Sequence, residues 1–286
     1  MTQTAFDKKP LAAALEYRLP TFPVVPMSAP RTTETKWGGV YVERGKPTAR
    51  HRDVLDAVLI AGQRVSDRAG QLHVVFDLAE VRRLLHTETD WRGIKKMLLD
   101  LAGTVISLRQ PGQGWPPAFP VLTFVGESNS TADRAGHQFP AKLKRITLSA
   151  GAAALLAAEA RICLTRETVE RVLSLQHQIS RSLARWCLSH SNEQHHRLAD
   201  VLVAIGAAEP GEPISGRQAR RNVRERVSWL REDAFALAEL GIEIDGETLH
   251  YRRKKGVFID AGTGVEPLTA VVEPLTAVVE PLTAVS

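Results

Sequence analysis

The chain has 286 residues, of which 44% are hydrophobic and 24% charged, a composition typical of folded globular proteins. Its net charge of +5 favours an anionic partner, and its two isolated cysteines, Cys163 and Cys187, favour a reducing compartment. No apolar run approaches the roughly 18 residues of a membrane span, and the N-terminus lacks the apolar core of a secretory signal, so we expect a cytoplasmic protein without membrane contact.

Prolines interrupt residues 1–45, so this segment is predicted to be an extended, Pro-rich arm. Its apolar side chains, such as Phe22 and Val24, fit docking either on the body of the protein or on a partner.

The pattern becomes regular from Lys46. Apolar spacing predicts helices over 50–64, 78–85, 91–101 and 149–160. Thr89 or Asp90 is the expected N-cap of the helix over 91–101, and Gly103 follows its end. Short β-branched and aromatic runs predict strands at 72–78, 104–108, 121–125 and 146–148. This order of helix, strand, helix, turn, helix, strand, loop, strand is typical of a winged helix.

A shortened version of the same order returns over 161–256. Helices are predicted from Thr165 onward, over 175–188, 197–205 and 215–240, the last with Ser215 as its N-cap and Gly241 as its stop. Residues 242–244 and 248–252 flank Asp245-Gly246 and predict a hairpin, the wing. The expected fold class is therefore mainly α with small β wings (α+β), as tandem winged-helix or helix-turn-helix domains over 46–160 and 161–256.

The predicted helix over 215–240 is strongly cationic at its start. Like charges repel at this spacing, and cations are unfavourable at the positive end of a helix dipole. Phosphates would reverse both effects, and arginine reads guanine in the major groove through two parallel hydrogen bonds. A solvated helix face is the alternative, but the pattern favours DNA contact through Arg217, Arg220, Arg221 and Arg224.

Two other cationic groups are weaker candidates. Arg92, Lys95 and Lys96 point away from the apolar face of the helix over 91–101. Arg252, Arg253, Lys254 and Lys255 end the second wing strand, where cations suit the phosphate backbone or minor groove, with a disordered basic tail as the alternative.

The combination of LTRETVERVLSLQHQISRSLARWCL, RQARRNVRERVSWL and ALAELGIEI resembles the replication initiators of iteron-bearing bacterial plasmids, most of all the IncQ type. The resemblance covers roughly residues 46–256 and is strongest over 162–250. It implies that the basic helix of the second unit enters the major groove of repeated origin sites, through Arg217, Arg220, Arg221 and Arg224. It implies that the first unit contacts adjacent DNA or another protomer, through Arg92, Lys95 and Lys96. Origin opening, loading of a replicative helicase, contacts with host replication proteins and self-association are likewise implied by the resemblance alone.

The heptapeptide VEPLTAV occurs three times over 265–285. Because proline recurs every seven residues, a continuous helix is excluded, and residues 257–286 are predicted to be a disordered tail. Seven codons span 21 nucleotides, about two turns of B-DNA. We hypothesise that the end of the gene overlaps direct DNA repeats.

No catalytic or cofactor signal stands out. His190, His195 and His196 lie near Cys187, but their spacing fits no standard zinc arrangement, so no metal is expected. There is no phosphate-binding Gly-rich loop followed by Lys and Ser or Thr. We therefore expect no enzyme and no cofactor, with a winged-helix transcriptional repressor and a protein-interaction module as alternative functions.

Overall fold

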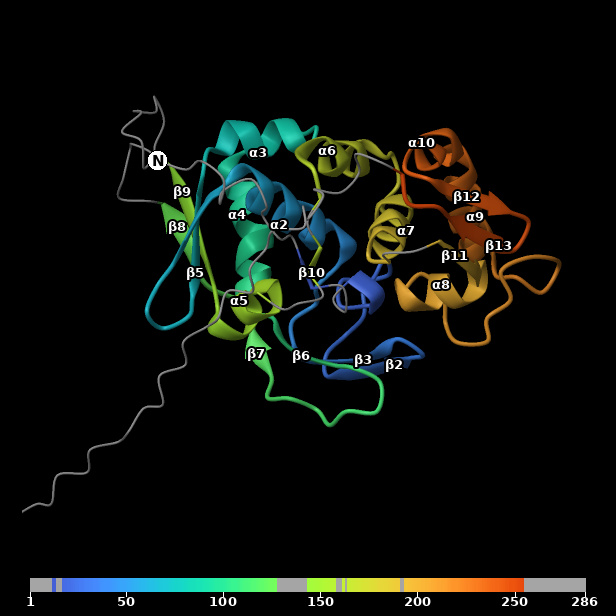
Figure 1. Ribbon diagram of the computed structural model, residues 1–286, viewed down its shortest axis with the longest axis horizontal. Coiled ribbons are helices and arrows are strands. Elements are labelled where there is room, and N and C mark those ends of the chain that lie inside the picture. The colour runs from blue at the N-terminus through green and yellow to red at the C-terminus, as the bar shows by residue number, and fades with distance from the viewer. Residues whose placement is uncertain are drawn as a thin grey trace, which may run out of the picture.

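The computed structural model describes residues 12–13, 17–127, 143–157, 161–162, 164–190 and 193–254 (Figure 1). This part of the chain combines helices with antiparallel sheets, so the α+β class is confirmed. Within it, every helix is too short or too polar to cross a membrane. The VEPLTAV repeats and Cys163 lie outside the described residues.

Three helices and one sheet form the centre of the first half. The helices are α2 (Ala49–Ala61), α3 (Leu78–Leu84) and α4 (Trp91–Ala102). The sheet has the order β4-β5-β9-β8, from β4 (Gln63–Ser66), β5 (Leu72–Phe76), β8 (Leu122–Glu127) and β9 (Lys144–Leu148). Helix α4 forms as predicted, because the Asp90 side chain accepts from the Gly93 N–H at 2.9 Å and Ile94 and Leu98 fill the core.

A second sheet corrects two predictions. It has the order β2-β3-β6-β7, from β2 (Arg31–Thr35), β3 (Gly38–Arg44), β6 (Val105–Arg109) and β7 (Phe119–Pro120). Residues 31–44 are therefore a hairpin within the folded body and not part of an arm. The strands predicted at 104–108 and 121–125 both form, but the order of elements typical of a winged helix is interrupted there, because β6 pairs with β3 and β7 while β8 pairs with β9 in the other sheet.

The second half is built around a smaller sheet. Its helices are α6 (Arg166–Ser174), α7 (Gln178–Leu188), α8 (Leu198–Ala204), α9 (Arg221–Glu232) and α10 (Ala234–Glu239). Its sheet has the order β11-β13-β12, from β11 (Gln194–Arg197), β12 (Ile242–Asp245) and β13 (Thr248–Tyr251). The turn between β12 and β13 is Gly246-Glu247, one residue later than predicted, because Asp245 still pairs with Thr248. Helix α5 (Ala150–Ala157) and the short pair β1 (Ala12–Ala13) and β10 (Arg161–Ile162) lie before this half.

The two halves share one topology. Each has a helix, a strand, two helices and a terminal strand pair, in which the last strand lies between the other two. The first half uses α2, β5, α3, α4, β8 and β9, and the second uses α7, β11, α8, α9, β12 and β13. The first half differs by the extra strand β4 between α2 and β5, and by the insertion of β6 and β7 after α4, which complete the sheet begun by β2 and β3.

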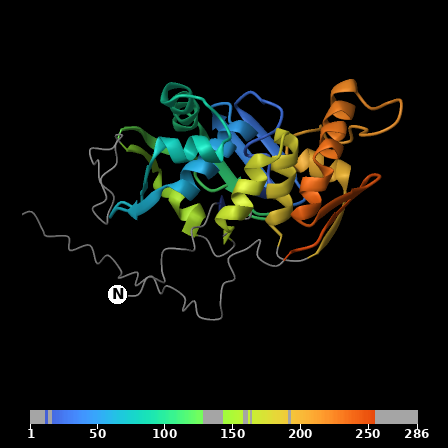
Figure 2. The same ribbon diagram turned by 90° about the horizontal axis from the view of Figure 1, so that it is seen from above.

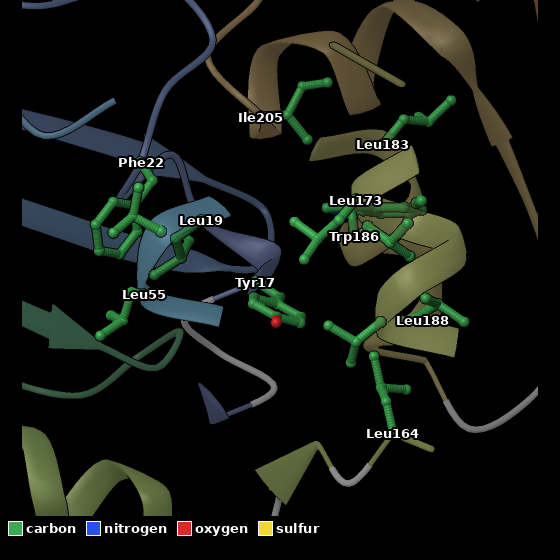
Figure 3. Packing of buried hydrophobic residues seen from close by; sticks show 14 of the residues in the cluster. Tyr17, Leu19, Phe22, Leu55, Leu164, Leu173, Leu183, Trp186, Leu188 and Ile205 are labelled. Atoms are coloured by element: carbon green, nitrogen blue, oxygen red, sulfur yellow. The ribbon is translucent and has the colours of Figure 1, made fainter. Parts of the chain in front are cut away.

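Residues 17–25, here the N-terminal segment, pack between the two halves. Tyr17, Leu19 and Phe22 are buried, and Figure 3 shows them between Leu55 of the first half and residues of the second. The N–H groups of Val24 and Val25 donate to the carbonyls of Ile205 and Gly206, both at 3.1 Å. Of the two sites considered for Phe22, the body of the protein is therefore the observed one.

A buried ionic network also joins the halves. On α2, Asp53 and Asp56 are each 2% exposed, and on α7 Arg185 is 4% exposed. Arg185 Nη2 lies 2.6 Å from Asp53 Oδ1, and its Nε lies 2.7 Å from Asp56 Oδ2. Arg181 adds a contact to Asp53 at 2.8 Å, and Arg52 one to Asp56 at 2.6 Å. Hydrophobic and ionic contacts therefore fix the position of α2 against α7.

Candidate nucleic-acid interface

Helix α9 begins at Arg221, later than the predicted start at Ser215. The Ser215 hydroxyl donates to Glu247 Oε1 in the turn between β12 and β13, so it does not cap the helix. Gly216, at φ +75°, then turns the chain away from helical geometry. As a result Arg217 lies in the loop before α9 and Arg220 is its N-cap, while Arg221 and Arg224 lie in its first turns.

The predicted continuous helix also breaks at Asp233. Both Asp233 oxygens accept backbone N–H groups at 3.1 Å, one from Gln176 and one from His177, at the start of α7. This carboxylate therefore attaches the break between α9 and α10 to the backbone just before α7. Leu230 and Leu237 are buried on either side of the break, whereas Ala234 between them is exposed.

The four arginines at the start of α9 are exposed but not equally free. Arg221 Nε lies 2.9 Å from Glu225 Oε1, and Arg220 lies 3.4 Å from Glu212 and 3.7 Å from Glu209. Arg217 and Arg224 form no ion pair with any residue that the structure describes. Two of the four arginines, Arg217 and Arg224, are therefore unpaired cations within the described structure, and the other two have carboxylate partners. Surface ion pairs contribute only about 0–1 kcal/mol, and the Arg221 side chain is 89% exposed, so the pairs leave these arginines available.

Sequence reasoning missed Glu209 and Glu212, which face Arg220. They begin and end the tight turn Glu209-Pro210-Gly211-Glu212, in which Gly211 has φ +77° and the Glu212 N–H donates to the Glu209 carbonyl at 3.0 Å. The Pro-Gly pair indicated the turn. Nothing in the sequence indicated that the turn folds back onto the N-cap of α9.

The three cations of α4 lie as predicted on the face opposite the core. Ile94, Leu98 and Leu101 are fully buried, Arg92 and Lys96 are exposed, and Lys95 is half-buried. No ion pair joins these cations to another described residue. Viewed from above, α4 and α9 extend from the same long side of the molecule, toward opposite ends (Figure 2). The structure thus turns the cationic helices of both halves to one side.

The cations after β13 have local partners. Arg252 Nε lies 3.8 Å from Glu193 Oε2, with 80% of its side chain exposed, and its backbone N–H donates to Gly241. Lys254 Nζ donates to the Ala238 carbonyl at 2.5 Å, at the C-terminal end of α10, where the helix dipole favours a cation. Arg253 is exposed beside them. These residues stay predicted DNA contacts, and Lys255 lies outside the described residues.

Of the histidines near Cys187, His190 and His196 both pack on Trp186, with their ring centroids 6.1 Å apart, whereas His195 lies elsewhere. His190 is buried and hydrogen-bonded through Nδ1 to the Trp186 carbonyl at 2.9 Å. Burial, and then the nearby Arg18, lower the pKa of His190 to about 4. His195 lies instead on β11, against His250 of β13, with their Nδ1 atoms 2.7 Å apart. No group of three or more described His, Cys, Asp or Glu residues is arranged to hold a metal ion.

Comparison with known proteins reveals a likeness of fold. No protein family and no curated protein matches the sequence. A crystal structure of domains 2 and 3 of RctB superposes with a TM-score of 0.50 at 11% identity, over 87% of this chain and 96% of that one. A second RctB structure, of residues 155–483, gives 0.45 at 11% identity, over 83% and 95%. The chain therefore has the fold of these RctB domains. This likeness does not extend to the IncQ type suggested by the sequence.

Proposed function

We propose that this protein is a non-enzymatic replication initiator that binds repeated sites in double-stranded DNA sequence-specifically. In this proposal both halves are winged helices, α9 and α4 are the reading helices, and β12–β13 and β8–β9 are the wings. Assembly of several protomers on plasmid origin repeats then opens the adjacent duplex and loads a helicase. The opening and loading steps rest on the resemblance to plasmid initiators.

The repeated topology supports the winged-helix assignment. In helix-turn-helix proteins the second helix of the pair lies in the major groove, and its N-terminal residues contact base edges. Helix α9 is the second helix after β11, and Arg220, Arg221 and Arg224 lie at its N-terminal end.

The single observation that carries the proposal is the exposed arginine cluster at the start of α9. Arg217, in the loop before α9, and Arg224, in its first turns, have no carboxylate partner among the described residues, and a cation near the start of a helix is unfavourable unless an anion is bound. DNA phosphates supply such an anion, and guanine edges supply acceptors for arginine. A protein-interaction module would need no such cluster.

The buried network between α2 and α7 supports joint use of both halves. Because Arg185, Asp53 and Asp56 fix the two helices against each other, α4 and α9 keep a constant relative position. Two DNA-reading helices at a constant relative position fit two stretches of one DNA duplex that are separated by a set spacing.

An electrophoretic shift assay tests DNA reading. Wild-type protein is mixed with the direct repeats of its replicon and with a scrambled duplex, each at two salt concentrations. We expect preferential binding of the repeats, with affinity falling steeply as salt rises. Arg220→Ala should cost about 1–3 kcal/mol if this arginine reads a base. Equal affinity for both duplexes, or affinity insensitive to salt, would contradict the proposal.

Replication in trans separates an initiator from a repressor with the same DNA-reading helices. Cells that express the protein receive a plasmid that carries only the repeats and the adjacent A·T-rich segment. An initiator maintains this plasmid, whereas a repressor does not. The Arg220→Ala variant, expressed at the same level, is the control.

A further inference from the structure

The geometry points to Glu212 as a positioning residue that orients Arg220 for base recognition. This inference rests on the proposed DNA-reading function and assigns to one carboxylate a part in sequence specificity. It concerns a residue that would not itself touch DNA.

Glu212 is held rigidly. Its side chain is 8% exposed, and its Oε2 accepts from the Glu209 N–H at 2.9 Å, while its own N–H donates to the Glu209 carbonyl. The Pro210-Gly211 turn between them fixes the backbone. Glu212 therefore presents its carboxylate in one orientation.

The remaining oxygen of Glu212 is directed at Arg220. Oε1 is buried, accepts no hydrogen bond within the described structure, and lies 3.4 Å from Arg220 Nε. Glu209 approaches the same guanidinium at Nη1, at 3.7 Å, but its side chain is 70% exposed. The buried carboxylate thus faces the Nε edge of Arg220 as an ion-pair partner, while the Arg220 side chain is 63% exposed.

Such a contact favours specificity over affinity. A free arginine loses side-chain entropy when it pairs with a base, whereas an arginine already held in place loses less. A carboxylate near phosphates also weakens binding to any DNA, because it repels them. The repulsion by Glu212 therefore lowers the affinity of the protein for DNA of every sequence. Only a site whose base pairs with the oriented Arg220 compensates for this loss.

The neighbouring contacts keep this arrangement in place. Ile214 and Ala219 are buried between the turn and α9, Ser215 is bonded to Glu247, and Arg226 donates to the Ala207 carbonyl. The loop from Gly206 to Arg220 is therefore attached to the wing turn and to α9.

A double-mutant cycle on the full chain tests the inference. The probe is a duplex selected from a randomised pool by the wild-type protein, with a scrambled duplex of equal length as the non-specific reference. The variants are Glu212→Gln, Glu212→Asp, Arg220→Ala and the double variant Glu212→Gln/Arg220→Ala. Glu239→Gln, on the exposed end of α10, removes the same charge and serves as the matched control.

We expect Glu212→Gln to weaken binding to the selected duplex about fivefold to tenfold while binding to the scrambled duplex stays equal or tightens, as in Glu239→Gln. The preference for one base over the others should fall at the single base pair that Arg220 contacts. In the Arg220→Ala background the same substitution should have no further effect on selectivity, and Glu212→Asp should retain part of it.

Two results overturn the inference and leave the proposed function standing. One is an unchanged selectivity ratio in Glu212→Gln. The other is an equal loss of selectivity with and without Arg220, which would make Glu212 a structural residue only. If the wild-type protein selects no sequence from the pool, the proposed function itself fails.

Discussion

Arg185 on α7 and Asp56 on α2 form an ion pair across the two halves of the protein, with Nε 2.7 Å from Oδ2 and both side chains buried. Burial lowers the pKa of Arg185, but the carboxylates of Asp56 and Asp53 outweigh it and raise this pKa above its ordinary value. A buried charge of this kind is tolerated only while its partners are present.

Removing one of those partners should destabilise the whole protein. We expect Asp56→Ala to lower the free energy of unfolding by about 3–5 kcal/mol, because it leaves Arg185 and Arg52 with fewer counter-charges in the core. Urea denaturation followed by circular dichroism measures this loss. Asp200→Ala removes a carboxylate from the exposed pair with Lys36 and should cost under about 1 kcal/mol. Similar losses in both variants would show that the buried network does not stabilise the fold.

The two unpaired arginines of the α9 region should matter most for DNA. Arg217→Ala and Arg224→Ala should each weaken binding by about 1–3 kcal/mol if they read bases, or reduce the salt dependence by about one unit of slope if they contact phosphates. Fluorescence anisotropy with a labelled duplex measures both quantities. Arg231→Ala, at the other end of α9, is the matched control. If it weakens binding as much, the start of the helix is not the reading end.

The cations of α4 decide whether the first half contacts DNA. The double variant Arg92→Ala/Lys96→Ala should lower the slope of log affinity against log salt by about 1.8 if both bind phosphates. Neither residue fills the core, so the free energy of unfolding should stay the same. An unchanged slope would assign this helix to contact with protein or solvent.

Stability should fall in mild acid through His190. Its folded pKa is about 4 against an ordinary value of 6.5, so the unfolded chain takes up the proton first as the pH falls. The free energy of unfolding should therefore decrease as the pH drops from about 6.5 toward about 4. In His190→Gln this part of the decrease should disappear, as urea titrations at a series of pH values would show. Parallel profiles for both proteins would mean that other groups cause the acid sensitivity.

Gly206 should tolerate no side chain. Its φ is +65°, and an added Cβ would lie 2.5 Å from Pro23 Cβ in the N-terminal segment. Gly206→Ala should cost about 1–3 kcal/mol or more, from backbone strain together with this clash. Gly216 has φ +75° but open space around it, so Gly216→Ala incurs the strain alone. Thermal unfolding should rank Gly206→Ala clearly below Gly216→Ala, and the reverse order would rule out the close contact with Pro23.

Local signals predicted some elements well. The Asp90 cap, the spacing of Ile94 and Leu98 and the final Gly103 gave α4 almost to the residue. Thr165 caps α6 in the same local way, by accepting from the Thr168 N–H at 3.2 Å. Where a helix boundary depends on side chains within one turn, the sequence is sufficient.

Boundaries set by distant partners could not be predicted. The helix start at Ser215 failed because its hydroxyl binds Glu247, and the break lies at Asp233, whose carboxylate binds the backbone just before α7. The strand β2, RTTET, carries little apolar alternation and forms because β3 pairs with it. For the candidate site, the arginines were visible in the sequence, but their pairing with Glu212 depends on a loop that folds back.

The N-terminal segment sets a practical limit on how the protein can be shortened. A fragment that begins at Lys46 would keep both cationic helices. It would lack Tyr17, Leu19 and Phe22, which are buried between the two halves. It would also leave the carbonyls of Ile205 and Gly206 without the N–H groups of Val24 and Val25. The apolar surface that these three side chains cover would then be exposed and would promote aggregation. Expression of this protein in a trimmed, soluble form therefore requires a start upstream of Tyr17.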